Sequence, residues 1–91
     1  MEHNQFPVPN SGLVKVLPGA DEFTVECTYI SAADKERLQD FLWRMRGRSG
    51  EFSFELADVV HPKCRFASDW VDFATNEANA YSVALRIKIV R

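Results

Sequence analysis

Two short segments hold the residue types that could perform chemistry, and the first is HPKC at residues 61–64. His61 and Cys64 are too few to hold zinc, which takes about four ligands, and His3 is the only other imidazole. Cysteine catalysis also needs a group that orients the imidazole, and none stands out. Cys64 moreover alternates with Phe66 as a core residue does. We therefore expect no catalytic residue, no metal and no cofactor, and a small enzyme built on His61 and Cys64 is the least favoured hypothesis.

Other patterns associated with catalysis or phosphate binding are weaker. Asp69 and Asp72 are three positions apart on a bent strand, a spacing that does not predictably bring two carboxylates together for acid–base work. We expect them to be solvated charges. Gly47 and Gly50 in GRSG predict a turn too short to cradle phosphates, and the chain contains neither a P-loop nor a dinucleotide-binding glycine motif.

The second segment combines basic and aromatic residues. Arg44, Arg46 and Arg48 lie close in sequence to Trp43 and Phe52. Basic surfaces with aromatic side chains bind single-stranded nucleic acids. However, arginines at the end of a helix also complement its dipole, and the net charge of the chain is −2. A small nucleic-acid-binding or regulatory module that uses this basic helix end is therefore the alternative function, and nucleic acid is not among the expected partners.

Length and composition favour one small domain outside membranes. The chain has 91 residues, 46% of them hydrophobic, which suffices for one core. No apolar run approaches the ~20 residues of a membrane span, and the N-terminus lacks the basic and apolar regions of a secretory signal. Cys27 and Cys64 lie in strand-like alternation, so we expect buried free thiols, with one disulfide as the alternative. We expect a soluble intracellular product or part of an assembly made inside a cell.

The N-terminal half predicts an arm followed by two strands. Residues 1–12 contain two prolines and a glycine and predict a flexible, extended arm, whereas residues 13–91 predict a single domain. Strict alternation of apolar and polar residues is typical of a half-buried strand. The predicted strands are Leu13–Leu17 and Glu22–Ile30, the second with Phe23, Val25, Cys27 and Tyr29 on one face.

A helix is expected over Ala32–Arg46. Ser31 is a good N-cap, because its hydroxyl can accept a bond from an amide of the first turn, and the Asp34 carboxylate opposes the positive end of the dipole. Gly47 or Gly50 is expected to end the helix. Its buried stripe follows the i, i+3, i+4, i+7 spacing and consists of Leu38, Phe41, Leu42 and Met45.

The C-terminal half predicts three strands, so that the order of elements is β-β-α-β-β-β. This order is typical of an α+β fold, either a mostly antiparallel sheet or a small sandwich with one helix packed on it. The hydrophobic phase slips near Ala67–Trp70, which predicts a bulge or a bend. The last two strands would form a long hairpin, a shape that suits the joining of neighbouring subunits. The elements are strand Glu51–Ala57, turn Asp58–Pro62, strand Lys63–Thr75, turn Asn76–Ala80 and strand Tyr81–Val90.

Several side chains are candidates for an interface. Trp43 lies at or beyond the border of the helical stripe, where it is either a boundary residue over the sheet edge or an anchor for another subunit. Trp70, at the phase slip, allows the same two interpretations. The full set of interface candidates is Trp43, Arg44, Arg46, Arg48, Trp70, Arg86 and Lys88.

The order of these patterns resembles a known family. An alternating strand leads into a helix that ends in FL and a glycine, an aromatic strand follows at once, and then come a K-C-x-F-x-x-x-W segment and a long alternating strand. This is similar to the M-type minor tail proteins of long-tailed phages and to the N-terminal domain of distal tail proteins. The matching segments are Phe23–Ile30, Leu38–Leu56, Lys63–Trp70 and Tyr81–Val90.

The resemblance implies a non-catalytic structural subunit of a phage or prophage tail, at the junction of tube and tip. Its implied partners are the tube protein, the tape-measure protein and tip proteins, together with further copies of the chain in a ring. A ring requires a head-to-tail interface that closes on itself, and strand addition would pair exposed sheet edges. The implied location is the host cytoplasm during assembly and then the virion tail, with no membrane contact.

Overall fold

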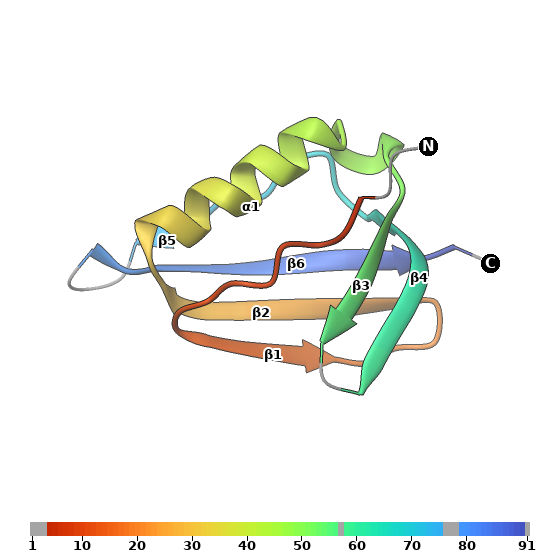
Figure 1. Ribbon diagram of the computed structural model, residues 1–91, viewed down its shortest axis with the longest axis horizontal. Helices are drawn as coiled ribbons and strands as arrows, with labels where there is room; N and C mark the ends of the chain where they lie inside the picture. Colours follow the sequence, from red (N-terminus) through yellow and green to blue (C-terminus); the bar gives the residue numbers. More distant parts are fainter. Residues whose placement is uncertain (1–3, 57, 76–78, 91) are drawn as a thin grey trace.

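The computed structural model describes residues 4–56, 58–75 and 79–90 of the chain. The described part forms one antiparallel sheet with a single helix packed on it (Figure 1). Along the sheet the strands follow the order β1-β2-β6-β4-β3, and β5 pairs with the beginning of β6. The elements are β1 (Leu13–Leu17), β2 (Glu22–Ile30), helix α1 (Ala32–Arg44), a 3₁₀ turn η1 (Gly47–Ser49), β3 (Phe52–Leu56), β4 (Val59–Phe66), β5 (Ala74–Thr75) and β6 (Tyr81–Ile89).

The centre of the sheet is the antiparallel pair β2 and β6. Their register places buried side chains opposite one another on the face that the helix covers. The buried stripe of α1 packs over this face, as its spacing predicts, because residues three and four apart share one side of a helix. The α+β class, with one helix on an antiparallel sheet, is therefore confirmed. The buried pairs are Phe23 with Ile87, Val25 with Leu85, and Cys27 with Val83, and the buried helical residues are Leu38, Phe41 and Leu42, followed by Met45.

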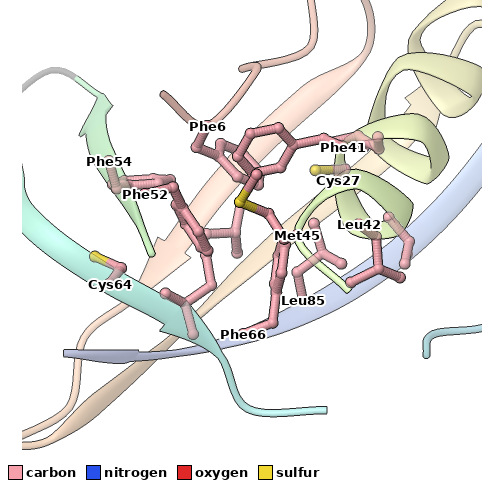
Figure 2. Packing of buried hydrophobic residues seen from close by; sticks show 14 of the residues in the cluster. Phe6, Cys27, Phe41, Leu42, Met45, Phe52, Phe54, Cys64, Phe66 and Leu85 are labelled. Atoms are coloured by element: carbon pink, nitrogen blue, oxygen red, sulfur yellow. The ribbon is translucent and has the colours of Figure 1, made fainter. Parts of the chain in front are cut away.

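Phenylalanines fill the core between α1 and the strands β3 and β4 (Figure 2). The rings of Phe52 and Phe66 are 4.7 Å apart between centroids, and Phe41 meets Phe52 edge to face at 5.2 Å. Phe6, from the N-terminal arm, lies 5.2 Å from Phe54 and 6.1 Å from Phe41. Offset and edge-to-face contacts of this kind stabilise aromatic clusters beyond the burial of their area.

The N-terminal arm is part of this packing. The Phe6 amide donates to the Ser53 carbonyl at 2.8 Å, and the Ser53 amide donates to the Asn4 carbonyl at 2.8 Å, so the arm lies along the outer edge of β3. The Phe6 side chain is only 2% exposed. Residues 4–12 are thus extended, as expected, but are packed against the domain rather than loose. Residues 1–3 of the predicted arm lie outside the described part.

Strand β2 ends differently from its prediction. After Cys27 the register with β6 shifts, and Tyr29 adopts a left-handed φ of 56°. The shift is a bulge, in which one extra residue reverses the alternation of faces. Tyr29 was expected on the buried face with Phe23, but it is 60% exposed, and Ile30 is buried in its place.

Strand β4 begins earlier than the sequence predicted. The predicted turn at Asp58–Pro62 is wrong, because β4 begins at Val59 and pairs with β3 from there. The register shifts by one residue between Phe52 and Phe54, opposite the stretch that contains Pro62. A bulge accommodates a proline in a strand because the proline has no amide hydrogen to donate.

The strand predicted over Lys63–Thr75 is two strands. β4 ends at Phe66, residues 67–73 form a loop, and β5 is only two residues long. Of the two predictions for the phase slip, the bend is therefore confirmed and the bulge is wrong, because the chain bends at residues 67–69, directly after β4. The hairpin of β4 and β6 is correspondingly short, since only Cys64–Phe66 pair with Ile87–Ile89. Ala57 and residues 76–78, which belong to a predicted strand and a predicted turn, lie outside the described residues.

A candidate docking surface at the end of the helix

Helix α1 ends at Arg44, two residues before its predicted end. The Met45 amide still donates to the Phe41 carbonyl at 2.9 Å, and Arg46 then takes the left-handed conformation, with φ 55° and ψ 51°. The Gly50 amide closes the turn by donating to the Met45 carbonyl at 2.8 Å. Helices commonly end on a left-handed residue, but that residue is usually glycine, because a side chain there costs roughly 1–2 kcal/mol.

The loop of residues 67–73 is fastened to this helix end through Asp69. The Asp69 Oδ1 atom accepts hydrogen bonds from the backbone amide and the Nε atom of Arg48, each at 3.1 Å. Gly47 makes the close approach possible, because a Cβ atom there would lie 2.6 Å from the Asp69 Cα atom. The loop therefore has a fixed position against η1.

This arrangement brings the two tryptophans to one surface. Trp43 is 76% exposed and Trp70 is 55% exposed. They line a groove of about 120 Å³, which we call the Trp43–Trp70 groove. Of the two interpretations of Trp43, the boundary residue and the exposed anchor, its high exposure favours the second, because the side chain gives little of its area to the core. The groove is lined by Leu42, Trp43, Arg46, Gly47, Asp69 and Trp70.

Some charged side chains at the groove have a partner of opposite charge, and others do not. Hydrogen bonds from the Arg48 backbone amide and side chain, together with the charge of Arg48, hold the pKa of the exposed Asp69 carboxyl below its usual value. Arg48 is thus committed to Asp69. Arg44 lies over the Phe41 ring, with its guanidinium carbon 5.5 Å from the ring centroid. Arg46 is exposed and makes no ion pair with any carboxylate of the described residues.

The remaining predicted interface residues lie elsewhere. Arg86 belongs to the sheet face that α1 does not cover, and its guanidinium makes a 2.9 Å ion pair with Glu22. Lys88 is the cross-strand neighbour of both Glu22 and Arg65 on the same face. Lys88 and Arg48 line a second, more open groove together with Arg65. The seven candidates therefore divide into a tryptophan surface and a charged sheet face.

His61 and Cys64 are close in space, but not in the geometry of a catalytic pair. The His61 ring stacks on Phe23 at 4.8 Å between centroids, whereas the Cys64 Sγ atom donates to the His61 backbone carbonyl at 3.7 Å. Burial raises the pKa of the Cys64 thiol to about 11, so almost no thiolate is present at neutral pH. Cys27, whose pKa is also raised to about 11 by burial and by the Asp34 charge, is likewise a buried free thiol, as expected.

The remaining candidates for chemistry are metal-binding groups and carboxylate pairs. Among the described residues, no group of three or more histidine, cysteine, aspartate or glutamate side chains is arranged to hold a metal ion. Asp69 and Asp72 line different grooves and do not form a carboxylate pair. In the same part of the chain, no helix has the length and apolar character needed to cross a membrane.

Asp34 has a role that the sequence did not reveal. Its buried carboxylate accepts hydrogen bonds from the Asn10 amide at 3.1 Å, the Ser11 amide at 3.0 Å, the Ser11 hydroxyl and the Arg37 guanidinium at 3.0 Å. Burial raises the pKa of Asp34, but these hydrogen bonds outweigh burial and leave the pKa below its usual value. The Ser31 hydroxyl caps α1 at the Asp34 amide, as predicted. Asp34 thereby ties the N-terminal arm to the start of the helix.

Comparison of the chain with protein-family models, with curated proteins and with solved structures gave no match.

Proposed function

We propose that this chain is a non-catalytic structural subunit of the tail of a long-tailed phage or prophage, at the junction of tube and tip. Its partners would be tube, tape-measure and tip proteins, with further copies of the chain in a ring. It would assemble in the host cytoplasm and remain in the virion tail. The sequence resemblance to M-type minor tail proteins and distal tail proteins motivates this function.

The exposed tryptophans are the observation that carries the proposal. Tryptophan is enriched at the hot spots of protein interfaces, because a large flat side chain removes much area from water when a partner covers it. Trp43 and Trp70 are both more than half exposed at one groove. A subunit whose role is to join neighbours needs anchors of this kind, and the contacts of Asp69 with Arg48 and Gly47 bring the two tryptophans to one surface.

The two edges of the sheet add a second line of support. The β3 edge is covered by Asn4–Phe6 of the arm, whereas among the described residues β1 pairs only with β2. A free edge presents unpaired amides and carbonyls that another strand can pair. Leu13 and Leu17 of β1 are exposed as well, at 72% and 38%. The β1 edge therefore suits strand addition by a neighbouring subunit.

The alternative function is a nucleic-acid-binding module that uses the basic helix end. The grouping of Trp43 and Trp70 beside Arg46 favours it, because bases stack on aromatic rings while arginines contact phosphates. Yet Arg48 is paired with Asp69, so that fewer positive charges remain than the sequence suggests. This neutralisation favours the structural role.

Co-expression tests the proposal. The chain is produced alone and together with the tube, tape-measure and tip proteins encoded by the same phage or prophage, and native mass spectrometry measures the complexes. We expect a complex with at least one of these proteins. A strict monomer in every combination, or a gene neighbourhood without any tail genes, would contradict the tail function.

A further inference from the structure

We propose that the Trp43–Trp70 groove binds a protein segment that presents one apolar side chain flanked by carboxylates. This inference deepens the proposed function and rests on it for the biological setting, because the segment would belong to a neighbouring tail protein. The chemistry of the segment, however, depends on the groove alone.

The size and lining of the groove specify the apolar anchor. The groove has a volume of about 120 Å³, and a wider hollow of about 470 Å³ shares Trp43 and Arg46 with it. The narrower groove suits one apolar side chain, and the wider hollow leaves room for the rest of the segment. Trp43, Trp70 and the neighbouring Leu42 supply the apolar part of the lining of the narrower groove. Insertion of one apolar side chain would remove area from both exposed rings, which is the favourable step in binding at such sites.

Contacts within the chain position both walls of the groove. Trp43 is in the last turn of α1, and Trp70 directly follows Asp69, which two hydrogen bonds from Arg48 fasten to η1. The close contact of Gly47 with Asp69 leaves no room between the two segments. A site that is already formed loses less conformational entropy on binding than one that must be assembled.

The charges at the groove specify the flanking carboxylates. Two charged residues line it, and Asp69 is neutralised by Arg48, so Arg46 supplies the remaining charge. Arg44 lies over the Phe41 ring and does not line the groove. The exposed carboxylates on the same helix, Glu36 and Asp40, also lie outside the lining. Among the residues that line the groove, the charge left without a partner in the described part of the chain is therefore the positive charge of Arg46, and it complements an acidic segment.

The backbone conformation of Arg46 gives an independent reason to assign a role to its side chain. A glycine would adopt the left-handed conformation without cost, and the position is exposed, so packing does not require the arginine. The guanidinium also makes no ion pair among the described residues. The backbone conformation favours glycine here, whereas the helix dipole favours a basic residue, and a binding contact would use the same unpaired charge.

The distribution of ion pairs favours a protein segment over nucleic acid. Binding to a phosphate backbone depends on the number of charges that contact phosphates. Two nearby arginines that could have extended the basic surface are already paired with carboxylates within the chain, which leaves fewer charges for phosphates. These pairs are Arg48 with Asp69 and Arg65 with Glu51.

The chain itself supplies the spectroscopic probe for a test. Trp43 and Trp70 are its only tryptophans, so intrinsic fluorescence reports on this groove. The full chain is titrated with a short, capped peptide that carries one leucine between glutamates, with the same peptide carrying lysines in place of the glutamates, and with oligothymidylate. We expect a saturable blue shift with the acidic peptide, and at least about tenfold weaker binding of the lysine peptide.

Two charge variants test whether Arg46 contacts the carboxylates of the peptide. Arg46→Glu should weaken binding of the acidic peptide by about tenfold or more, because it reverses the unpaired charge. Lys63→Glu makes the same change in net charge on β4, outside the groove, and should leave the affinity within about twofold. Equal binding of the acidic and the lysine peptide, or no saturable shift at millimolar peptide, overturns the proposal. Tighter binding of oligothymidylate overturns it in favour of nucleic acid.

The outcome is independent of the tail function. If the chain co-assembles with tail proteins but the acidic peptide does not bind, the groove inference fails and the proposed function stands. If the peptide binds with the expected dependence on Arg46 but no tail protein co-assembles, the groove is a docking site and the tail function fails.

Discussion

At its N-terminal end, helix α1 is capped by Ser31 and joined to the N-terminal arm by the buried carboxylate of Asp34. At its C-terminal end, Trp43 is exposed, and Arg46 holds an unfavourable conformation without a charged partner among the described residues. The first end uses its polar groups to complete the fold. The second leaves large apolar area and a positive charge available, and we therefore assign stability to the first end and binding to the second.

Residue type alone does not distinguish the end of α1 that stabilises the fold from the end that we assign to binding. Both ends carry charged residues in the positions that the helix dipole favours, acidic at the start and basic at the end. What differs is whether neighbouring segments satisfy them. The Asp34 carboxylate accepts four hydrogen bonds from the arm and from Arg37, whereas the Arg46 guanidinium makes no ion pair with any carboxylate of the described residues. Substitutions at the two ends should accordingly affect different measurements.

The largest loss of stability is expected from Phe6→Ala. Phe6 is 2% exposed and contacts four phenylalanine rings, so truncation leaves a cavity in the core and releases the arm. The free energy of unfolding should fall by about 3–4 kcal/mol, measured by urea denaturation. Leu13→Ala, at a side chain that is 72% exposed, is the control and should change it by less than about 0.5 kcal/mol. A loss below about 1 kcal/mol for Phe6→Ala would contradict the role of the arm in the core.

The second-largest loss of stability is expected from Asp34→Ala. It leaves the Asn10 and Ser11 amides without their acceptor in a partly buried place and removes the link from arm to helix. We expect a loss of about 2–3 kcal/mol in unfolding free energy. Asp40→Asn, an exposed carboxylate on the same helix, serves as the control and should cost less than about 0.5 kcal/mol. Equal effects of the two substitutions would count against a special role for the N-terminal end.

Acidification should remove part of the stabilisation that the ionised Asp34 carboxylate provides. The pKa of Asp34 is lowered in the folded state, so the ionised form stabilises the fold above the unfolded pKa of about 3.9, and this is lost as pH falls through the folded pKa. The difference in unfolding free energy between the natural chain and Asp34→Asn should be constant above about pH 5 and shrink below about pH 4. A difference that grows on acidification would show that the carboxylate is destabilising.

At the other end, Arg46→Gly should stabilise the fold. Glycine adopts the left-handed conformation freely, so the unfolding free energy should rise by about 0.5–1 kcal/mol, although glycine also makes the unfolded chain more flexible. The same variant should bind the acidic peptide more weakly. Arg44→Gly, inside the last helical turn, is the matched change in charge and should destabilise by about 1 kcal/mol. Loss of stability in Arg46→Gly would remove the argument from backbone strain.

The smallest effect on stability is expected for Trp43→Ala. The side chain is 76% exposed, so its removal should change the unfolding free energy by about 0.5 kcal/mol or less. Tyr29→Ala removes another exposed aromatic side chain, away from the groove, and is the matched control. Both variants should unfold like the natural chain in urea. A large loss for Trp43→Ala would assign this residue to the core and favour the boundary interpretation.

The sequence predicted the elements that alternation specifies. The bounds of β1 follow from a short apolar run that Pro18 and Gly19 end, those of β2 from a period of 2, and the buried stripe of α1 from a period of 3.6 residues, and they agree with the structure. The bulge that exposes Tyr29 and the start of β4 at Val59 were not predicted. Both depend on which strand lies alongside, and a single strand's pattern does not carry that information.

The candidate surface was predicted only in its parts. Trp43 and Trp70 were each identified as possible anchors, but what joins them is the contact of Arg48 with Asp69, 21 residues apart. The alternation of the last strand predicts that Arg86 and Lys88 face outward, and they do so on the uncovered sheet face, away from the tryptophans. The burial of Phe6 was also missed, because an arm that contains two prolines gives no periodic signal of its contact with the core.

The double variant Trp43→Ala/Trp70→Ala tests the central claim most directly. It is co-expressed with the tube, tape-measure and tip proteins of the same phage or prophage, and native mass spectrometry compares its complexes with those of the natural chain and of Tyr29→Ala. The account predicts that the natural chain and Tyr29→Ala co-assemble, while the double variant stays unbound with an unchanged unfolding free energy. Co-assembly of the double variant to the same extent as the natural chain would contradict it.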